Sequence, residues 1–415
     1  MPLAECRMIY PPKRGSRIRV LLSFFSENYQ RRPVARPETP PRRILLIRPS
    51  ALGDVCRTVP LIASLKSAWP DSGIDWIVQE EFLPAVRTHP AVETFIAFPR
   101  QRFARWYRNA AVFAEFRHWM RRLREREYDL VIDAQGLGRS GFMAWRTRAP
   151  IRIGPREARE FGWLGYTVRH QAPPADDAMP VHTVDRMLML LEPLGIPIVR
   201  DMRLYVEPAA RDWWTEIRRQ LGLLDEPYAV IAPTSRWPSK RWPIERWGEL
   251  IKPLLQRGFG RIMLIGAPGE IDQVKPILPN RDHPEMPLVN LIGRADLAQT
   301  LAVIANADLV IANDSAPLHM AVGFDRPCLG LFGPTDPRTV GPYDRPLSSL
   351  RGFAPKPGEI VHYRDPKIGD RLMRVISTSA VLQRVDQVLA HHEEQAASHR
   401  TVAAGGRLSG EESTG

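Results

Sequence analysis

The chain of 415 residues is long enough for two domains that each bury a core. Its hydrophobic content of 44% and charged content of 25% are ordinary for a soluble globular protein. The formal net charge of +12, carried by an excess of arginine, is not ordinary. It predicts acidic partners, such as a phosphorylated glycolipid, an anionic membrane face or nucleic acid.

The cysteines and the apolar runs exclude further classes of protein. Cys6, Cys56 and Cys328 are odd in number and share no metal-ligand spacing, which argues against a disulfide framework or a zinc site. No run approaches the roughly 18 apolar residues that span a bilayer. The short apolar run from Val20 to Phe25 lacks the length and cleavage pattern of a secretory signal. We therefore expect a cytoplasmic protein without a metal.

The first 42 residues are rich in proline and arginine without sustained periodicity, which predicts a disordered basic leader. A first domain is expected over residues 43–197. Its β-branched apolar runs alternate with helical segments, and this alternation predicts an open parallel sheet. The expected strands are 44–48, 74–78, 94–97, 130–134 and 151–154, and the expected helices are 55–68, 82–88 and 181–194.

Residues 100–127 have the most unusual composition of this domain, with nine arginines interleaved with aromatic residues. Phe113, Phe116, Met120 and Leu123 recur at helical spacing, which predicts an amphipathic helix with a basic outer face. Two interpretations stay open, a solvated helix packed on the sheet and a surface that meets an anionic membrane or acceptor. A glycine-rich loop at 135–141 follows, and one such loop is weak evidence of a phosphate site.

A second domain is expected over residues 198–390, followed by a disordered polar tail at 391–415. Its expected strands are 228–232, 261–265, 288–291, 309–312 and 328–332, and its expected helices are 212–221, 242–257, 296–305 and 318–322. The same alternation predicts a second doubly wound sheet. Two such domains imply one shared cleft.

The stretch from Asp308 to Asp336 holds the densest group of polar residues at the end of an expected strand. Asp314 and Ser315 precede a short helix, where capping alone would explain them. The unit of strand, helix and strand is also one whose helix N-terminus and strand ends hold phosphates. His319 lies one helical turn after Ser315, so both side chains can face one ligand.

With all these segments in view, the sequence resembles glycosyltransferase family 9, the ADP-heptose:lipopolysaccharide heptosyltransferases. The resemblance is closest to the heptosyltransferase I branch, which adds the first heptose to the Kdo residues of lipid A. Six motifs occur in the family's order, spanning roughly 43–345. They are RILLIRPSALGDV at 43–55, YDLVIDAQGL at 128–137, the loop from Thr to Lys-x-Trp at 234–242, GAPGE at 266–270, DSAPLH at 314–319 and FGPTDP at 332–337.

The resemblance implies the GT-B fold, with two Rossmann-like domains facing a cleft, and an inverting transfer of heptose from ADP-heptose to the Kdo-lipid A core. Asp54 is the implied general base and Lys240 the implied diphosphate ligand. The implied donor-binding residues are Thr234, Ser235, Lys240, Glu270, Asp314, Ser315, Ala316 and His319, and Arg57, Gln135 and Arg139 are candidates for acceptor binding. An anionic inner-membrane surface is an expected partner, so the protein would lie on the cytoplasmic face. No nucleic acid, cofactor or divalent metal is expected.

The chemistry independently requires these residue types. An attacking acceptor hydroxyl must lose a proton, which calls for a carboxylate, and the departing diphosphate gains charge that Lys240 and helix N-terminal amides can stabilise. A helix N-terminus lowers the pKa of a carboxyl such as Asp54, which makes it a weak base, so the proton transfer would be late. Asp54 as a plain helix cap is the alternative.

Two residues depart from the family pattern. Ala316 stands where the family usually has glycine, which allows a closer approach of the backbone to phosphate. Arg48 stands where lysine is common, and the two side chains differ in hydrogen-bond geometry.

Other classes of protein stay open at this point. A close variant would use another nucleotide sugar or add a later heptose. A non-catalytic nucleotide- or nucleic-acid-binding protein would fit the charge of +12 and would bind polynucleotides with a steep salt dependence. A dinucleotide-dependent dehydrogenase is a third possibility and is disfavoured.

Overall fold

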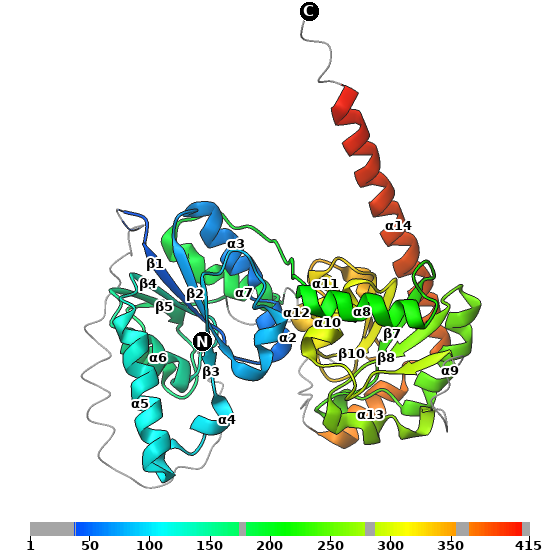
Figure 1. Cartoon of the computed structure of the whole chain (residues 1–415), viewed down its shortest axis with the longest axis horizontal. Helices are drawn as coiled ribbons and strands as arrows, with labels where there is room; N and C mark the ends of the chain where they lie inside the picture. The colour runs from blue at the N-terminus through cyan, green and yellow to red at the C-terminus, as the bar shows by residue number, and fades with distance from the viewer. Residues whose placement is uncertain (1–36, 38, 174–179, 279–286, 354–364, 409–415) are drawn as a thin grey trace, which may run out of the picture.

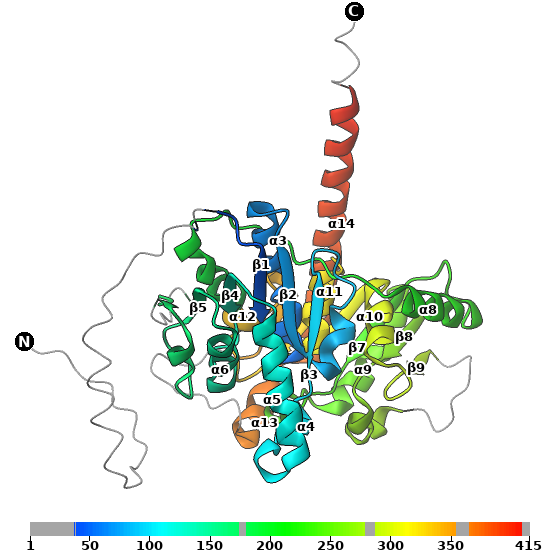
Figure 2. The same cartoon turned by 60° about the vertical axis from the view of Figure 1, so that its left-hand side comes forward.

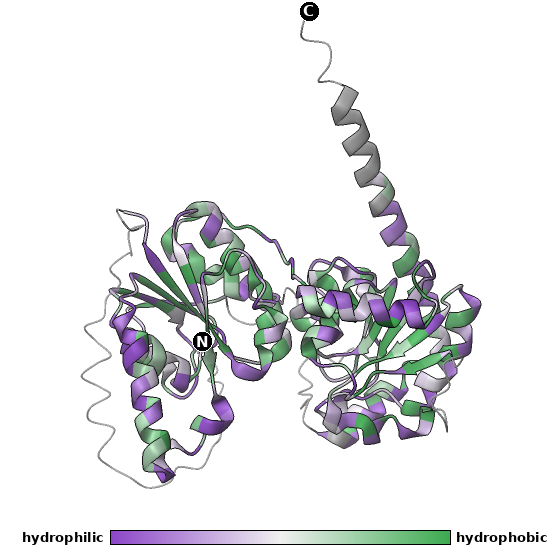
Figure 3. Cartoon of the chain, viewed as in Figure 1, coloured by the Kyte–Doolittle hydropathy of each residue, from purple (hydrophilic) through white to green (hydrophobic). Residues whose placement is uncertain are grey.

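The computed structural model describes residues 37, 39–173, 180–278, 287–353 and 365–408, so most of the predicted leader lies outside the described residues. Two parallel six-stranded sheets form side by side (Figure 1). Figure 3 shows that the strands of both sheets are largely hydrophobic. Strands that are buried on both faces need such continuous apolar runs, and this requirement explains the sequence pattern.

The first sheet has the order β3-β2-β1-β4-β5-β6. Its strands are β1 Arg43–Ile47, β2 Gly73–Gln79, β3 Thr94–Phe98, β4 Leu130–Asp133, β5 Ile151–Pro155 and β6 Val168–His170. Its helices are α2 Leu52–Cys56, α3 Val59–Ala68, η1 Glu80–Ala85, α4 Arg100–Phe103, η2 Trp106–Arg108, α5 Ala110–Glu125, α6 Gly138–Thr147, η3 Gly162–Gly165, α7 Thr183–Leu188 and η4 Met189–Leu194. The order of strands reverses between β1 and β4, which places a ligand crevice at their carboxyl ends.

The second sheet repeats this plan with the order β12-β11-β10-β7-β8-β9. Its strands are β7 Tyr228–Ala232, β8 Arg261–Leu264, β9 Leu288–Asn290, β10 Leu309–Asn313, β11 Cys328–Phe332 and β12 Ser349–Arg351. Its helices are α8 Pro208–Gln220, η5 Pro238–Lys240, α9 Ile244–Gln256, η6 Pro268–Gln273, η7 Lys275–Ile277, α10 Leu297–Ala305, α11 Ala316–Gly323, α12 Pro337–Val340, η8 Pro346–Ser348, α13 Pro366–Arg374 and α14 Thr378–Leu408. The reversal lies between β7 and β10.

One buried hydrophobic cluster runs through both domains. It contains Leu46 and Ile132 of the first sheet together with Val230 and Val310 of the second. Helices α2 and α11 pack on each other where the domains meet. The two halves of the crevice are therefore held against each other by apolar packing as well as by the connecting chain.

Several expected elements differ from those observed. The helix expected at 55–68 is two helices, α2 and α3, and the helix expected at 82–88 is the 3-10 helix η1. The strands β6 and β12 were missed, because each is a three-residue edge strand without an apolar run. The tail expected to be disordered from residue 391 is helical to Leu408, and α14 projects from the second domain (Figures 1 and 2).

Candidate active site

The candidate site lies where the carboxyl ends of β1, β4, β7 and β10 meet. Asp54 follows β1, Gln135 follows β4, Thr234 follows β7 and Asp314 follows β10. These four strands flank the reversals of strand order in the two sheets. Parallel strands present their carboxyl ends at one edge, so residues up to 260 positions apart converge on one crevice.

The two halves of the site touch at Gly53 and His319. A Cβ atom on Gly53 would lie 2.7 Å from Cδ2 of His319 and 3.5 Å from Cα of Ala316. Only glycine allows α2 to approach α11 this closely. The predicted phosphate-binding turn and the predicted general base are thereby brought next to each other.

Asp54 is held by two arginines. Its Oδ2 lies 2.8 Å from Nη2 of Arg48, and its Oδ1 accepts a hydrogen bond from Nη2 of Arg57. The Ala51 amide also donates to Oδ2 at 3.3 Å. Burial would raise the pKa of Asp54, but the charges of Arg48 and Arg57 and these hydrogen bonds outweigh burial and hold the pKa well below its usual range. Asp54 is therefore ionised throughout the physiological pH range.

Arg57, a candidate for acceptor binding, also connects the domains. Its Nη1 donates to the carbonyl oxygen of Val340 at 3.1 Å while Nη2 holds Asp54. Arg48 contributes a further hydrogen bond to the Ala134 carbonyl at the end of β4. Arg48, where the family commonly has lysine, thus uses both terminal nitrogens of its guanidinium group. A lysine has a single side-chain nitrogen and could not reproduce this arrangement.

Lys240 and Asp314 form a second buried charge pair on the opposite wall. Lys240 Nζ lies 2.6 Å from Asp314 Oδ2, and Thr335 Oγ1 donates to the same oxygen at 2.6 Å. The pair joins η5 to the end of β10. Thr335 was missed as a site residue, although it stands inside the FGPTDP motif at 332–337.

Glu270 orders the neighbouring loops of the second domain. Its Oε2 accepts from Thr234 Oγ1 at 2.7 Å and from the Ala267 amide at 3.0 Å. Ser235 is also buried, and its amide donates to Gln273 Oε1 at 3.2 Å. The carboxylate of Glu270 retains a second oxygen that could accept hydrogen bonds from ligand hydroxyls.

Helix α11 directs its N-terminus into the crevice. Ser315 is the N-cap residue, yet its Oγ donates to the Asn313 carbonyl at 3.1 Å and does not cap the helix. No side chain caps the start of α11. Pro317 has no N–H, and the Leu318 amide donates to the Ser315 carbonyl at 3.3 Å. The Ala316 amide is thus the group of this turn that can receive an anion at the helix N-terminus. His319 in the same helix is buried, and burial with the charge of Arg57 lowers its pKa, so the imidazole is neutral.

The remaining acceptor candidates occupy different places. Gln135 Oε1 accepts from the Ser50 amide at 3.1 Å, so it lies beside the loop that carries Asp54. Arg139 is exposed, and its guanidinium carbon lies 5.7 Å from the ring centroid of Phe98. Gln135 thus lies at the loop that carries Asp54, whereas Arg139 lies beside Phe98 at the end of β3.

A set of contacts across the domain boundary was missed by sequence reasoning. His182 Nδ1 accepts from the Val184 amide at 3.1 Å, and its Nε2 donates to the Gly341 carbonyl at 3.0 Å. Thr183 Oγ1 donates to the Thr339 carbonyl at 2.9 Å. The bonds to Gly341 and Thr339 reach backbone carbonyls 159 and 156 residues along the chain, so no local sequence motif could have revealed them.

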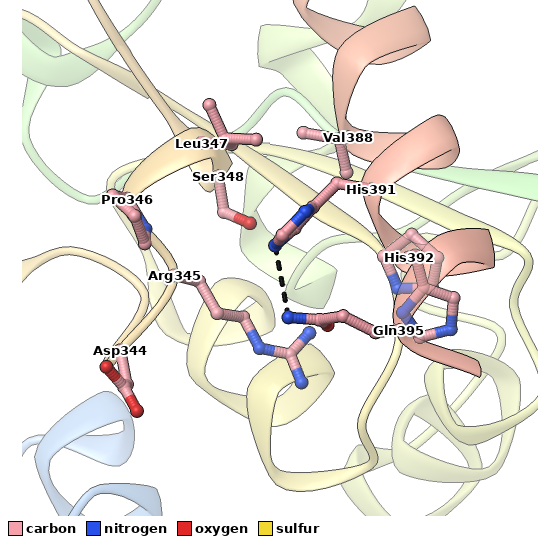
Figure 4. A pocket seen from close by; sticks show the side chains of 10 residues that line it. Asp344, Arg345, Pro346, Leu347, Ser348, Val388, His391, His392 and Gln395 are labelled. Atoms are coloured by element: carbon pink, nitrogen blue, oxygen red, sulfur yellow. Dashed lines mark hydrogen bonds between the residues drawn. The ribbon is translucent and has the colours of Figure 1, made fainter. Parts of the chain in front are cut away.

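A small cavity of about 40 Å³ lies apart from this site, between the loop at 344–348 and α14 (Figure 4). Its lining includes Arg345, His391 and Gln395, with a 3.0 Å contact between the last two. It contains none of the predicted site residues. Within the parts of the chain that the structure covers, no cluster of three or more histidine, cysteine or acidic residues could hold a metal ion.

The fold and the paired charges of the crevice define a glycosyltransferase of the GT-B type, which binds a nucleotide sugar between two Rossmann-like domains. The family model of glycosyltransferase family 9 (heptosyltransferase) matches residues 116–358. The chain belongs to this family, which confirms the predicted family and fold class.

The curated relatives of the chain include lipopolysaccharide heptosyltransferases. The chain is 31% identical over 310 residues to lipopolysaccharide heptosyltransferase 1 of Pseudomonas aeruginosa, covering 73% of this chain and 82% of the relative. It is 28% identical over 297 residues to lipopolysaccharide heptosyltransferase 3 of Escherichia coli, covering 68% and 80%. The solved Escherichia coli heptosyltransferase WaaC with ADP-2-deoxy-2-fluoro heptose is 27% identical, with a TM-score of 0.64 over 83% of this chain and 99% of that one.

Proposed function

We propose that this enzyme transfers heptose from ADP-heptose to the Kdo-lipid A inner core in lipopolysaccharide biosynthesis, with inversion at the anomeric carbon. The observation that carries the proposal is the position of Asp54, whose neighbour Gly53 packs against His319 of the donor wall. A carboxylate is thereby placed beside the helix N-terminus that would receive the diphosphate. The resemblance to a relative whose solved structure contains an ADP-heptose analogue supports the choice of donor.

Donor binding is assigned to the second domain. Lys240 and the Ala316 amide at the start of α11 would bind the diphosphate, and Glu270 would accept hydrogen bonds from the ribose hydroxyls. Asp314 keeps Lys240 in position through its 2.6 Å contact. Ala316 at the start of α11 sits against this diphosphate position, where its methyl group limits how closely the backbone can approach.

In the transfer step, the acceptor hydroxyl oxygen bonds to the anomeric carbon and the bond from that carbon to the diphosphate oxygen breaks. The electron pair leaves with ADP, whose added charge Lys240 stabilises without requiring a metal. The hydroxyl proton passes to Asp54. Because Arg48 and Arg57 lower the pKa of Asp54, it becomes an effective acceptor only late, when the attacking oxygen already carries positive charge.

The acceptor would be presented to the first domain, with Arg57, Gln135 and Arg139 as its candidate ligands. Two of these side chains are cationic, which suits the phosphates of a lipid acceptor. No helix in the described part of the chain is long and apolar enough to cross a bilayer. The enzyme would work on the cytoplasmic face of the inner membrane as a peripheral protein.

A second candidate function is addition of a later heptose, because the relative named heptosyltransferase 3 is 28% identical.

The test is transfer from ADP-heptose to Kdo2-lipid A, measured for wild type, Asp54→Ala and Lys240→Ala. We expect turnover in wild type, loss in both variants, and retained ADP binding in Asp54→Ala.

The controls are Asp386→Ala and Lys275→Ala, which remove exposed ion-pair partners remote from the crevice. They should transfer at the wild-type rate. Transfer only to an acceptor that already carries heptose would assign the later step. ADP binding without transfer to either acceptor would reject heptosyl transfer to the core.

A further inference from the structure

The first domain exposes large aromatic side chains on three of its elements. Tyr107 is 63% exposed on η2, Trp145 is 53% exposed on α6 and Phe161 is 62% exposed at the start of η3. Trp106, Phe142 and Leu164 are exposed beside them on the same three elements. We call these six residues the aromatic face. Such a concentration of exposed rings marks an interaction surface.

Helix α6 and η3 are fixed to each other through their backbones. A Cβ on Gly141 would lie 2.1 Å from the Gly162 carbonyl oxygen, and one on Gly165 would lie 1.9 Å from the Gly141 carbonyl oxygen. This close approach needs glycine and leaves no room for relative sliding. The rings of α6 and the side chains of η3 therefore belong to one rigid surface.

The backbone at Phe161 supports a role for its exposed ring. Its φ is 60°, and that of the preceding Glu160 is 56°, so two successive residues with side chains adopt the left-handed region. This conformation is unfavourable for bulky residues and is retained where the surroundings impose it. Here it carries a phenylalanine ring out into solvent.

The rings of η2 form an ordered cluster with α5. Trp106 stacks on Phe113 and Phe116 with centroids 5.5 and 5.3 Å apart. Phe116 in turn contacts Phe103. Helices α5 and α6 lie side by side in Figures 1 and 2, and the hairpin formed by α4, η2 and α5 protrudes from the first domain.

The segments that carry these rings are rich in arginine. Residues 100–127 contain nine arginines and three glutamates, and residues 138–170 contain seven arginines and two glutamates. Their formal net charges are thus +6 and +5, against +12 for the whole chain. Arg108 lies over the ring of Tyr107 with its guanidinium carbon 5.4 Å from the centroid. Aromatic rings with flanking arginines suit the interface of an anionic bilayer, where rings enter the head-group layer and arginines meet phosphates.

A groove between β3 and α5 has the same chemistry. It encloses about 790 Å³ and shares Phe103 with the aromatic cluster of the hairpin. Phe95, Ile96 and Trp119 provide apolar walls, and Arg121 and Arg122 stand at its rim. The combination of apolar walls and a cationic rim matches a lipid chain attached to a phosphate-bearing head group.

We propose that the aromatic face docks the first domain on an anionic lipid bilayer, with exposed arginines of residues 100–127 and 138–170 contacting the lipid phosphates. This inference extends the proposed function, because an acceptor anchored in the bilayer must be reached at its surface. It assigns α6 and η3 to the docking surface along with the basic helix α5.

The test is co-sedimentation of the full chain with vesicles of phosphatidylethanolamine and phosphatidylglycerol. The aromatic variant is Tyr107→Ala/Trp145→Ala/Phe161→Ala, and the charge variant is Arg121→Gln/Arg122→Gln. The matched control is Leu224→Ala/Val375→Ala, which truncates exposed apolar residues of the second domain. All truncated side chains are exposed, and circular dichroism with thermal unfolding checks that each variant folds.

We expect wild type and the control to bind the anionic vesicles equally, and the aromatic variant to bind about tenfold more weakly. The charge variant should bind more weakly and with a smaller salt dependence than wild type. Wild-type binding by the aromatic variant would overturn the proposal. The proposal would also be overturned if wild type did not bind the vesicles but bound polyuridylic acid. It would be overturned as well if wild type formed dimers that the aromatic substitutions abolished.

A second readout separates this inference from the proposed reaction. With a water-soluble, deacylated Kdo acceptor, the aromatic variant should keep the wild-type kcat/KM, whereas with acceptor in vesicles its kcat/KM should fall about tenfold. Equal losses with both acceptors would mean a structural role and overturn the docking surface. Vesicle binding by a wild type that transfers to neither acceptor would leave the docking surface standing and reject the proposed function.

Discussion

Gly53 of the first domain lies against the imidazole of His319 in the second, with room for a hydrogen atom and none for a methyl group. A Cβ on Gly53 would fall 2.7 Å from Cδ2 of this buried ring. Neither helix can yield without separating the two halves of the candidate site. The glycine of the turn at 49–54 is thus a packing requirement between domains as well as part of a local turn.

The first prediction concerns this contact. Gly53→Ala should lower the free energy of unfolding by about 1–3 kcal/mol, as overpacking does, and should reduce kcat/KM by pushing α2 away from α11. Urea unfolding and the transfer assay measure the two effects. Gly269→Ala is the control for stability, because its Cβ would meet no atom within 4 Å. Adding His319→Ser should restore most of the stability lost in Gly53→Ala, and no restoration would refute the steric explanation.

The second prediction concerns the pH dependence contributed by Asp54. Its folded-state pKa is depressed by Arg48 and Arg57 despite burial, so its ionised form stabilises the fold above the unfolded-state pKa of about 4. That contribution should disappear as the pH falls below about 4 toward the folded-state pKa. Wild type should therefore exceed Asp54→Asn in stability at pH 7, and the difference should shrink in acid.

Urea unfolding at several pH values measures this difference. Asp386→Asn, an exposed partner of Arg257, is the matched control. A stability difference between wild type and Asp54→Asn that stays constant from pH 7 into acid would contradict the assigned pKa shift.

The third prediction concerns His182 at the domain boundary. Burial lowers the pKa of His182 from 6.5 to about 4, so between these values the unfolded chain binds a proton that the folded chain does not. Stability should then fall as the pH drops from 6.5 toward 4, by up to about 1.4 kcal/mol per pH unit. His182→Gln should remove this part of the acid sensitivity, since glutamine can donate to the Gly341 carbonyl without titrating. His118→Gln on the exposed face of α5 should leave it unchanged.

The fourth prediction concerns the charge pair of Lys240 and Asp314. Removing one partner leaves a buried charge uncompensated, so Lys240→Met and Asp314→Asn should each weaken ADP binding, by about 10-fold or more. The two changes should not add, because they act on one 2.6 Å contact. Titration calorimetry with ADP on the single and double variants gives the coupling. Strict additivity would show that the two residues act on ADP independently.

Much of the fold could be predicted from the sequence, because the central strands are buried on both faces and read as unbroken apolar runs. On this basis a strand was expected at 309–312, and it is observed at Leu309–Asn313. The edge strand Ser349–Arg351 could not be, because a single leucine between a serine and an arginine forms no apolar run. Its pairing with β11 depends on tertiary contacts alone.

The candidate site was predictable only where a residue type belongs to a motif. Lys240 and Asp314 were both expected at the donor, yet their mutual contact, and the hydrogen bond from Thr335, depend on two loops meeting in space. Arg57 was expected at the acceptor, and its bond to the Val340 carbonyl joins positions 283 residues apart. Individual roles of these side chains in binding and catalysis stay predictions for the assays above.

The hydrophobic cluster shared by the two sheets has a consequence for cooperativity. Unfolding one domain would expose buried apolar residues of the other to water, so neither domain is expected to be stable as an independent folding unit. Calorimetric melting should give a single transition, and limited proteolysis should release no stable half-molecule. The donor-binding and acceptor-binding sides of the crevice would therefore unfold together. No partly folded intermediate would bind the nucleotide without the carboxylate of Asp54 beside it.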